Sequence, residues 1–182
     1  SYRAAPRTLR EGIARARRRP RRCAAGRELR FRSAGDECGC VGHEVVSGRI
    51  SEVTVATNGQ GMIDVSGLVA AEVANASSDD GLCTVFIRHT SASLVVQENA
   101  DPSAQDDLER WLERLVPEGD PLYQHTAEGP DDMPAHIKAA LTATSLSIPV
   151  RAGKLMLGTW QGIFLWEHRR GHNTRRLIIH VL

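Results

Sequence analysis

Three histidines are the residues of this sequence best suited to bind a metal. His89 follows an apolar run, His125 lies in a polar loop, and His136 lies at the start of an expected helix. Three imidazoles from separate elements can hold a divalent ion and leave one position open for water or substrate. Their separations match no compact ligand motif such as H-E-x-x-H, so surface or hydrogen-bonding roles also stay open.

Carboxylates form a second group with chemical potential. Glu98 and Glu167 each end an apolar run, where a side chain can point into a cleft at the edge of a sheet. Asp131 and Asp132 are equally suited to cap the helix that follows them. Together with Glu128, such carboxylates beside histidines could hold Mg²⁺ with a diphosphate, because Mg²⁺ prefers carboxylate and phosphate oxygens.

Hydroxyl groups surround the first histidine, since Thr90 and Ser91 follow His89 directly. A serine nucleophile is disfavoured because no G-x-S-x-G elbow occurs, and because neighbouring residues of a strand face opposite sides. Another dense stretch places Trp160 and Gln161 at a glycine-flanked break between two strands, where Trp160 could line a pocket or belong to the core.

The elements that must position these residues can be read from hydrophobic periodicity. Helices are expected at 67–77, from Asp101-Pro102 onward, and at 134–141. In the second helix an i, i+3, i+4, i+7 pattern predicts a core-facing stripe of Leu108, Trp111, Leu112 and Leu115. Alternating or apolar runs predict strands at 49–57, 82–89, 93–98, 145–150, 153–160, 162–168 and 175–182.

This order of elements predicts an α+β fold, with a mixed, mostly antiparallel sheet and segregated helices. The stretch 84–97 is expected to run as a strand that carries core residues on one face and delivers His89 to a pocket. Glu98 and Asn99 would then lie at the end of that strand, near the same pocket.

Charge divides the chain into two parts. Residues 1–32 hold 12 Arg and 2 Glu, a net charge of +10, whereas the whole chain has a net charge of +1. We therefore expect residues 1–42 to be a disordered extension and residues 43–182 to be an acidic globular domain. The extension could serve organelle targeting, while a nucleic-acid partner is not expected.

Composition also bears on the location of the protein. No apolar run reaches the roughly 18 residues that span a bilayer, and no secretory signal pattern is seen, so no membrane partner is expected. Cys83 is expected to be a small buried hydrophobe, and the four cysteines show no disulfide framework. These features favour a cytoplasmic location.

Four blocks of sequence resemble the YjbQ family in their order and spacing: "IRHTSASLVVQENADPSAQDDL", "DPLYQHTAEGPDDMPAHIKAAL", "SIPVRAGKLMLGTWQGIFLWEHR" and "RRLIIHVL". The resemblance covers about residues 49–182. It implies an α+β homotrimer with a weak thiamine-phosphate synthase activity, which joins hydroxymethylpyrimidine diphosphate to thiazole phosphate and releases diphosphate. This chain reads "EHRRGHNTRR" where many members read "E-x-D-G-P-R".

With the resemblance, we predict a divalent metal, Zn or Mg, held by His89, His125 and His136. Catalytic roles fall to Glu98, Glu128 and Glu167, and a small phosphorylated substrate would contact Thr90, Ser91, Asn99, Trp160 and Gln161. Two alternatives remain open: a non-catalytic homotrimer that binds a metal or anion, and a metal-dependent hydrolase of unknown substrate.

Overall fold

The computed structural model describes residues 48–76 and 80–182 of the chain. The Arg-rich segment 1–42 lies outside these residues, so its separation from a globular domain at 43–182 stays a prediction. The described part contains, in chain order, β1 Arg49–Asn58, β2 Gly61–Asp64, α1 Ser66–Asn75, β3 Asp80–Ile87, β4 Ala92–Glu98, α2 Pro102–Leu115, α3 Asp132–Leu141, β5 Ser145–Arg151, β6 Lys154–Leu155, β7 Gln161–Glu167 and β8 His172–Val181.

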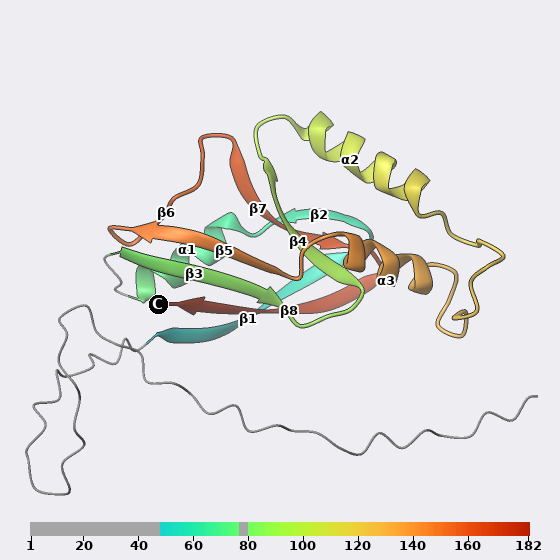
Figure 1. Cartoon of the computed structure of the whole chain (residues 1–182), viewed down its shortest axis with the longest axis horizontal. Coiled ribbons are helices and arrows are strands. Elements are labelled where there is room, and N and C mark those ends of the chain that lie inside the picture. Colours follow the sequence, from blue (N-terminus) through green and yellow to red (C-terminus); the bar gives the residue numbers. More distant parts are fainter. Residues whose placement is uncertain (1–47, 77–79) are drawn as a thin grey trace, which may run out of the picture. The chain divides into compact units, whose positions relative to one another are not determined.

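The strands form two antiparallel sheets (Figure 1). Sheet A has five strands in the order β1-β8-β3-β5-β6, and sheet B has three in the order β2-β7-β4. The pairings within both sheets are antiparallel. The predicted α+β class, with mostly antiparallel strands and separate helices, is confirmed.

The main core lies between sheet A, sheet B and α1. Side chains alternate between the two faces of a strand, so Val85 of β3 and Leu165 of β7 point into the same layer. Helix α1 contributes Val69, which is fully buried. Cys83 belongs to this core as predicted, and burial raises the pKa of its thiol to about 11.

The opposite face of sheet B is covered by α2. This helix packs on Trp166 of β7 through side chains spaced four residues apart, Leu108, Leu112 and Val116. The prediction of a wider core-facing stripe was therefore wrong in part, because Trp111 and Leu115 are each 52% exposed. Since α2 meets the sheet along a single row of side chains, the residues beside that row stay in solvent.

Both later helices begin near the aspartates that the sequence offers. Asp101 caps α2, and its Oδ1 accepts a hydrogen bond from the Ser103 amide at 2.9 Å. Helix α3 begins at Asp132, two residues before the expected start at Pro134. Asp131 occupies its N-cap position without a side-chain capping bond.

The polar stretch Arg88–Ser91 is a corner between the two sheets. Strand β3 ends at Ile87 in sheet A, and β4 begins at Ala92 in sheet B. The expectation of one strand across 84–97 was therefore wrong, since the chain changes sheets at this point. Two smaller differences are β2, which was not predicted, and β6, which has two residues where a strand was expected over 153–160.

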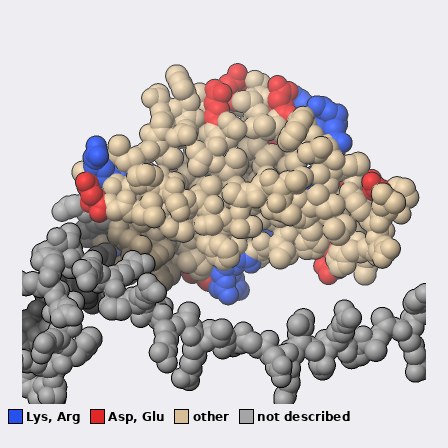
Figure 2. Space-filling view, in the orientation of Figure 1, with Lys and Arg blue, Asp and Glu red and all other residues tan. Residues whose placement is uncertain are grey.

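Charged side chains lie mainly around the rim of the face shown in Figure 2, and the middle of that face is largely uncharged. Within the described residues, no helix is both long and apolar enough to cross a membrane.

Candidate metal site at the start of α3

Two of the three predicted metal ligands, His125 and His136, come together around Asp132. His136 follows Asp132 by four residues in α3, which places both side chains on one face of the helix. His125 approaches from the preceding loop, and its ring centroid lies 5.5 Å from that of His136. One ligand atom from each residue lies within 4.8 Å of the other two. The structure thus groups two imidazoles with one carboxylate.

The Asp132 carboxylate is the buried centre of this group, at 1% exposure. Its Oδ1 accepts a hydrogen bond from Arg169. Its Oδ2 lies 2.8 Å from Nε2 of His125 and 3.4 Å from Nε2 of His136. Neither contact has hydrogen-bond geometry, so Oδ2 has no hydrogen-bond partner in the described part of the chain. A buried oxygen left in this way is costly unless a cation or proton reaches it.

The orientation of His136 explains why its ring does not serve Oδ2 as a donor. Its Nδ1 lies 3.0 Å from the Thr90 carbonyl oxygen, which can only accept a hydrogen bond. The neutral ring therefore carries its proton on Nδ1 and turns the lone pair of Nε2 toward Asp132. A backbone carbonyl that fixes the tautomer in this way is a common outer partner of metal-binding histidines.

These three groups fit a zinc ion by type and by spacing. Zinc in catalytic sites takes three protein ligands from imidazole and carboxylate groups and keeps one position open. With bonds of about 2.0–2.1 Å in a tetrahedron, neighbouring ligand atoms would lie roughly 3.3 Å apart. The Oδ2 to Nε2 distances of 2.8 and 3.4 Å are close to that value.

Arg169 holds the aspartates in place from the end of β7. Its Nε donates to Asp131 Oδ2 at 3.0 Å, and another nitrogen donates to Asp132. It also donates to the Glu128 carbonyl oxygen at 2.9 Å, while the exposed Glu128 carboxylate lies 4.0 Å away. Burial acts to raise the pKa of Asp131, but hydrogen bonds from the Arg170 amide and Arg169 outweigh it and lower the pKa.

His89 lies outside this group, although it was predicted as a third ligand. Its Nε2 accepts from the Arg176 amide at 3.0 Å, and its Nδ1 lies 3.3 Å from an Arg175 guanidinium nitrogen. Burial, followed by the charge of Arg175, lowers the pKa of His89. The corner at 88–91 turns this ring toward β8, so Asp132 occupies the third position in the α3 group.

Glu167 was expected in a cleft as a catalytic carboxylate, but it is fully buried. Arg175 donates to both of its oxygens, at 2.6 and 2.5 Å. Thr57 and the Arg169 amide add bonds of 2.8 and 2.9 Å. Alternation along β7 places residue 167 on the inner face with residues 163 and 165, so the carboxylate joins the two sheets from inside.

The predicted substrate-binding residues fall into two places. Thr90 and Ser91 line an open hollow of about 480 Å³ together with His89. At the far end of β4, beyond Glu98, the Asn99 amide donates to the Trp160 carbonyl oxygen at 3.0 Å. The Asn99 side chain reaches the Gln161 carbonyl oxygen at 3.5 Å. Because β4 has seven residues, roughly 20 Å of strand separates these places.

Asp132 and Arg169 are the residues of the α3 group that were not predicted to join His125 and His136. Asp132 was interpreted as a possible helix cap and, among the other carboxylates, as a possible Mg²⁺ ligand, whereas no role was predicted for Arg169. The spacing of Asp132 and His136, four residues apart within a helix, was a usable signal because such residues share a face. No local pattern pointed to Arg169, which reaches the group from 37 residues away.

Comparison with known proteins identifies the family of this chain. The family model described as UPF0047 protein YjbQ-like matches residues 51–182. The chain belongs to the UPF0047 YjbQ-like family. A UPF0047 protein of Synechocystis is 51% identical over 129 residues, covering 71% of this chain and 88% of that protein. UPF0047 protein YjbQ of Escherichia coli O157:H7 is 46% identical over 116 residues, covering 61% and 83%.

Solved structures agree with this UPF0047 assignment. A YjbQ/UPF0047 family protein of Clostridium acetobutylicum superposes with a TM-score of 0.67 at 36% identity, covering 72% of this chain and 99% of that one. The hypothetical protein APE1520 of Aeropyrum pernix gives a TM-score of 0.68 at 29% identity, covering 74% and 98%. These names state no reaction, so the comparisons establish the family and the fold.

Proposed function

We propose that this UPF0047 chain binds one divalent metal ion at His125, Asp132 and His136, with a preference for zinc. The bound metal would act on a small phosphorylated substrate. The observation that carries the proposal is the buried Asp132 Oδ2, which faces two imidazole nitrogens without a hydrogen-bond partner among the described residues. Two imidazoles and one carboxylate favour zinc over magnesium, because magnesium prefers an all-oxygen environment.

A hollow beside this group provides room for a substrate. It has a volume of about 350 Å³ and is lined by His125, Tyr123 and neighbouring loop residues. This size falls within the range of sites for small ligands, roughly 300–1,000 Å³. A bound metal would place positive charge at the edge of the hollow, which suits a phosphate or diphosphate group.

The reaction that we put first is thiamine-phosphate synthesis, a transferase reaction, and its support is the family resemblance of the sequence. A carbon–nitrogen bond forms between hydroxymethylpyrimidine diphosphate and thiazole phosphate, and the carbon–oxygen bond to the leaving diphosphate breaks. When bound, the metal would supply charge neutralisation for the diphosphate. Arg169 would act as a positioning residue, since it holds Asp132 and the N-terminal turn of α3.

We also propose that the chain forms the homotrimer that the resemblance implies. Apolar side chains on the outer side of sheet A support an interface there: Phe86 is 44% and Leu82 is 38% exposed. Light scattering on the protein as it elutes from a size-exclusion column should give three times the chain mass, and a monomer would contradict the assembly.

A reducing, cytoplasmic location suits Cys83, which is a buried free thiol.

The metal assignment is tested by elemental analysis of protein purified without chelators. We expect about one zinc per chain in the parent and little in His125→Ala, Asp132→Asn or His136→Ala. His172→Ala is the control, because His172 is exposed and lies outside the group. His89→Ala should also keep the metal, which separates the group seen in the structure from a site built on three histidines.

Two results would overturn the metal site: no metal in the parent, or an unchanged metal content in Asp132→Asn. The reaction is tested separately, by measuring diphosphate release from the two substrates with the zinc-loaded parent. Zinc binding without turnover would favour a non-catalytic binding role over the synthase reaction.

A further inference from the structure

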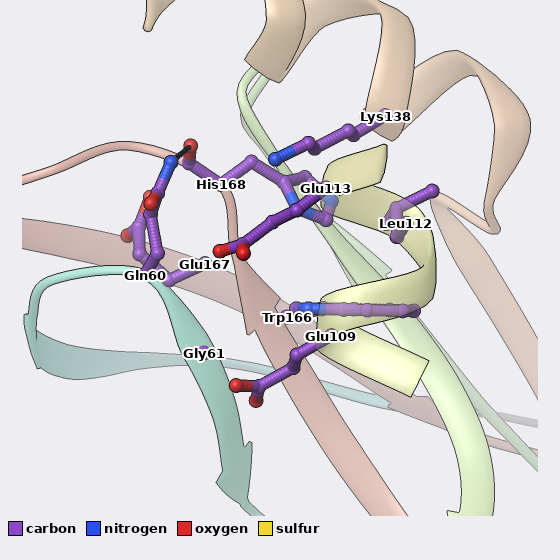
Figure 3. Close-up of a pocket in the computed structure, with 9 residues that line it drawn as sticks. All are labelled: Gln60, Gly61, Glu109, Leu112, Glu113, Lys138, Trp166, Glu167 and His168. Carbon is purple, nitrogen blue, oxygen red and sulfur yellow. Dashed lines mark hydrogen bonds between the residues drawn. The ribbon is translucent and has the colours of Figure 1, made fainter. Parts of the chain in front are cut away.

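A second polar group lies in a pocket between α2, α3 and the end of β7 (Figure 3). The pocket has a volume of about 40 Å³, and Lys138, Glu113, Trp166 and His168 line it. Because a single water needs about 10–15 Å³ measured in this way, the space holds a few waters or one very small molecule. It does not include His125, Asp132 or His136.

Lys138 presents an unpaired positive charge to this pocket. The residue is 4% exposed, and Figure 3 shows its ammonium group pointing into the opening. Within the described residues, no hydrogen bond or ion pair reaches that ammonium group, and Glu113 and Glu118 act on it only as nearby charges. Glu118, a nearby carboxylate, is paired with Arg170 at 2.9 Å. The Lys138 nitrogen is not among the buried atoms without a partner, so it is open to the pocket, and a positive charge at the end of an otherwise buried side chain favours a ligand that accepts hydrogen bonds.

Glu113 presents the opposite charge to the same pocket. It comes from α2, is exposed, and makes no hydrogen bond or ion pair in the part of the chain that the structure describes. Its carboxylate is separated from the Lys138 ammonium by more than ion-pair distance. The buried side chains of Trp166 and Leu112 also line the pocket and form its apolar wall.

The remaining polar neighbours are already engaged. Ser93 Oγ and His168 Nε2 lie 2.9 Å apart and form a buried pair. Glu109 Oε1 accepts a hydrogen bond from the Met62 amide at 2.7 Å. Among the described residues that line the pocket, the charged groups without a hydrogen bond or ion pair are therefore Lys138 on α3 and Glu113 on α2.

We propose that this pocket binds a small zwitterion of the α-amino acid class, of about the size of glycine. The carboxylate of such a ligand would accept hydrogen bonds from Lys138, and its ammonium group would donate to Glu113. A simple anion would meet Glu113 unpaired, and a simple cation would meet Lys138 unpaired. A side chain much larger than that of glycine would be excluded by the small volume.

The chain offers a direct probe, because it contains only two lysines, Lys138 and Lys154. Lysine labelled with ¹³C at Cε should give two side-chain signals in the 182-residue protein. Lys154 is exposed in β6 and serves as the internal control. Titration with glycine in the presence of EDTA should shift the Lys138 signal to saturation and leave the Lys154 signal in place. The chelator makes this result independent of the proposed metal site.

Variants and half-ligands then test both ends of the ligand. Glu113→Gln should weaken glycine binding at least about tenfold, because it removes one charge-assisted hydrogen bond and leaves the shape unchanged. In calorimetric titrations, Lys138→Met should show no glycine binding, whereas Lys154→Met should bind glycine as the parent does. Acetate and methylamine should each bind at least about tenfold more weakly than glycine.

Three results would overturn the proposal. They are no shift of the Lys138 signal at tens of millimolar glycine, equal shifts of both lysine signals, and an acetate response as strong as the glycine response. The last result would assign the pocket to simple anions instead. Since Glu113 is exposed, its glutamine variant keeps the test valid even if Lys138→Met folds poorly.

Discussion

Replacing Arg175 by methionine should destabilise the fold strongly, because it leaves a carboxylate unpaired inside the core. Arg175 is 7% exposed and Glu167 is 0% exposed as side chains, and two hydrogen bonds of 2.6 and 2.5 Å join them. Removing one partner of such a buried pair costs about 3–5 kcal/mol. Thr57 and the Arg169 amide still bind Glu167, so we expect about 3 kcal/mol, at the lower end of that range.

The matched control is Arg176→Met on the neighbouring residue of β8. Arg176 is exposed, and its guanidinium lies 4.0 Å from Glu52, so its loss should change stability by less than about 0.5 kcal/mol. Urea unfolding followed by circular dichroism at neutral pH measures both variants. The Arg175→Met/Glu167→Gln double variant should be more stable than Arg175→Met alone, because no buried charge is left unpaired.

The pH dependence of Arg175→Met gives a second check. Burial acts to raise the pKa of Glu167, but hydrogen bonds from Arg175, the Arg169 amide and Thr57 lower it in the parent. The parent therefore loses this stabilisation only as pH falls through the lowered pKa. Without Arg175, burial should dominate and protonation should relieve the cost, so the deficit should shrink toward acid pH. A deficit below about 1 kcal/mol, or one equal to that of Arg176→Met, would refute the reasoning.

Two further predictions concern Gly162 and His168. A Cβ on Gly162 would lie 2.9 Å from the Phe164 ring and 3.0 Å from Asn99 Cβ, so Gly162→Ala should cost about 1–3 kcal/mol in urea unfolding. Gly67→Ala, which meets nothing within 4 Å in α1, should instead be neutral or stabilising, and equal effects would contradict this packing. Burial lowers the pKa of His168 to about 3 in the folded protein, so on acidification this histidine takes up its proton in the unfolded chain first. The free energy of unfolding should therefore fall by about 1.4 kcal/mol per pH unit below about pH 6.5. His168→Gln should remove the part of this pH dependence that His168 causes, so an unchanged slope of stability between about pH 6.5 and 5 would contradict the prediction. The lowered pKa of His89 adds a smaller change of the same sign in both proteins.

Local patterns were sufficient for most of the elements. The alternation at 49–57, the Asp101-Pro102 helix start and the apolar run before Glu167 each correspond to an element of the structure. Such patterns work because backbone geometry and side-chain periodicity act over a few residues. They failed at the corner 88–91, because whether two apolar runs stay in one sheet depends on their partners.

The candidate site was predicted in part for the same reason. His125 and His136 were identified as residues with metal-binding chemistry, and they meet in the structure. His89 was grouped with them on residue type alone, yet its ring faces Arg175 and Arg176. Residue type states what a side chain can do, while its neighbours are set by which strands pair and which helix covers them.

The sequence by itself determined the family, the α+β class and the inventory of reactive groups, since these depend on composition, periodicity and motif order. Only the tertiary structure decided that Glu167 is buried against Arg175, that Asp132 joins the two histidines, and that Lys138 faces a pocket without a partner. The physical reason is that burial and charge pairing are properties of side chains brought together from distant segments. Even adjacent residues have different partners: Glu167 pairs with Arg175 of β8, whereas the ring of His168, just beyond β7, lies against Ser93 of β4.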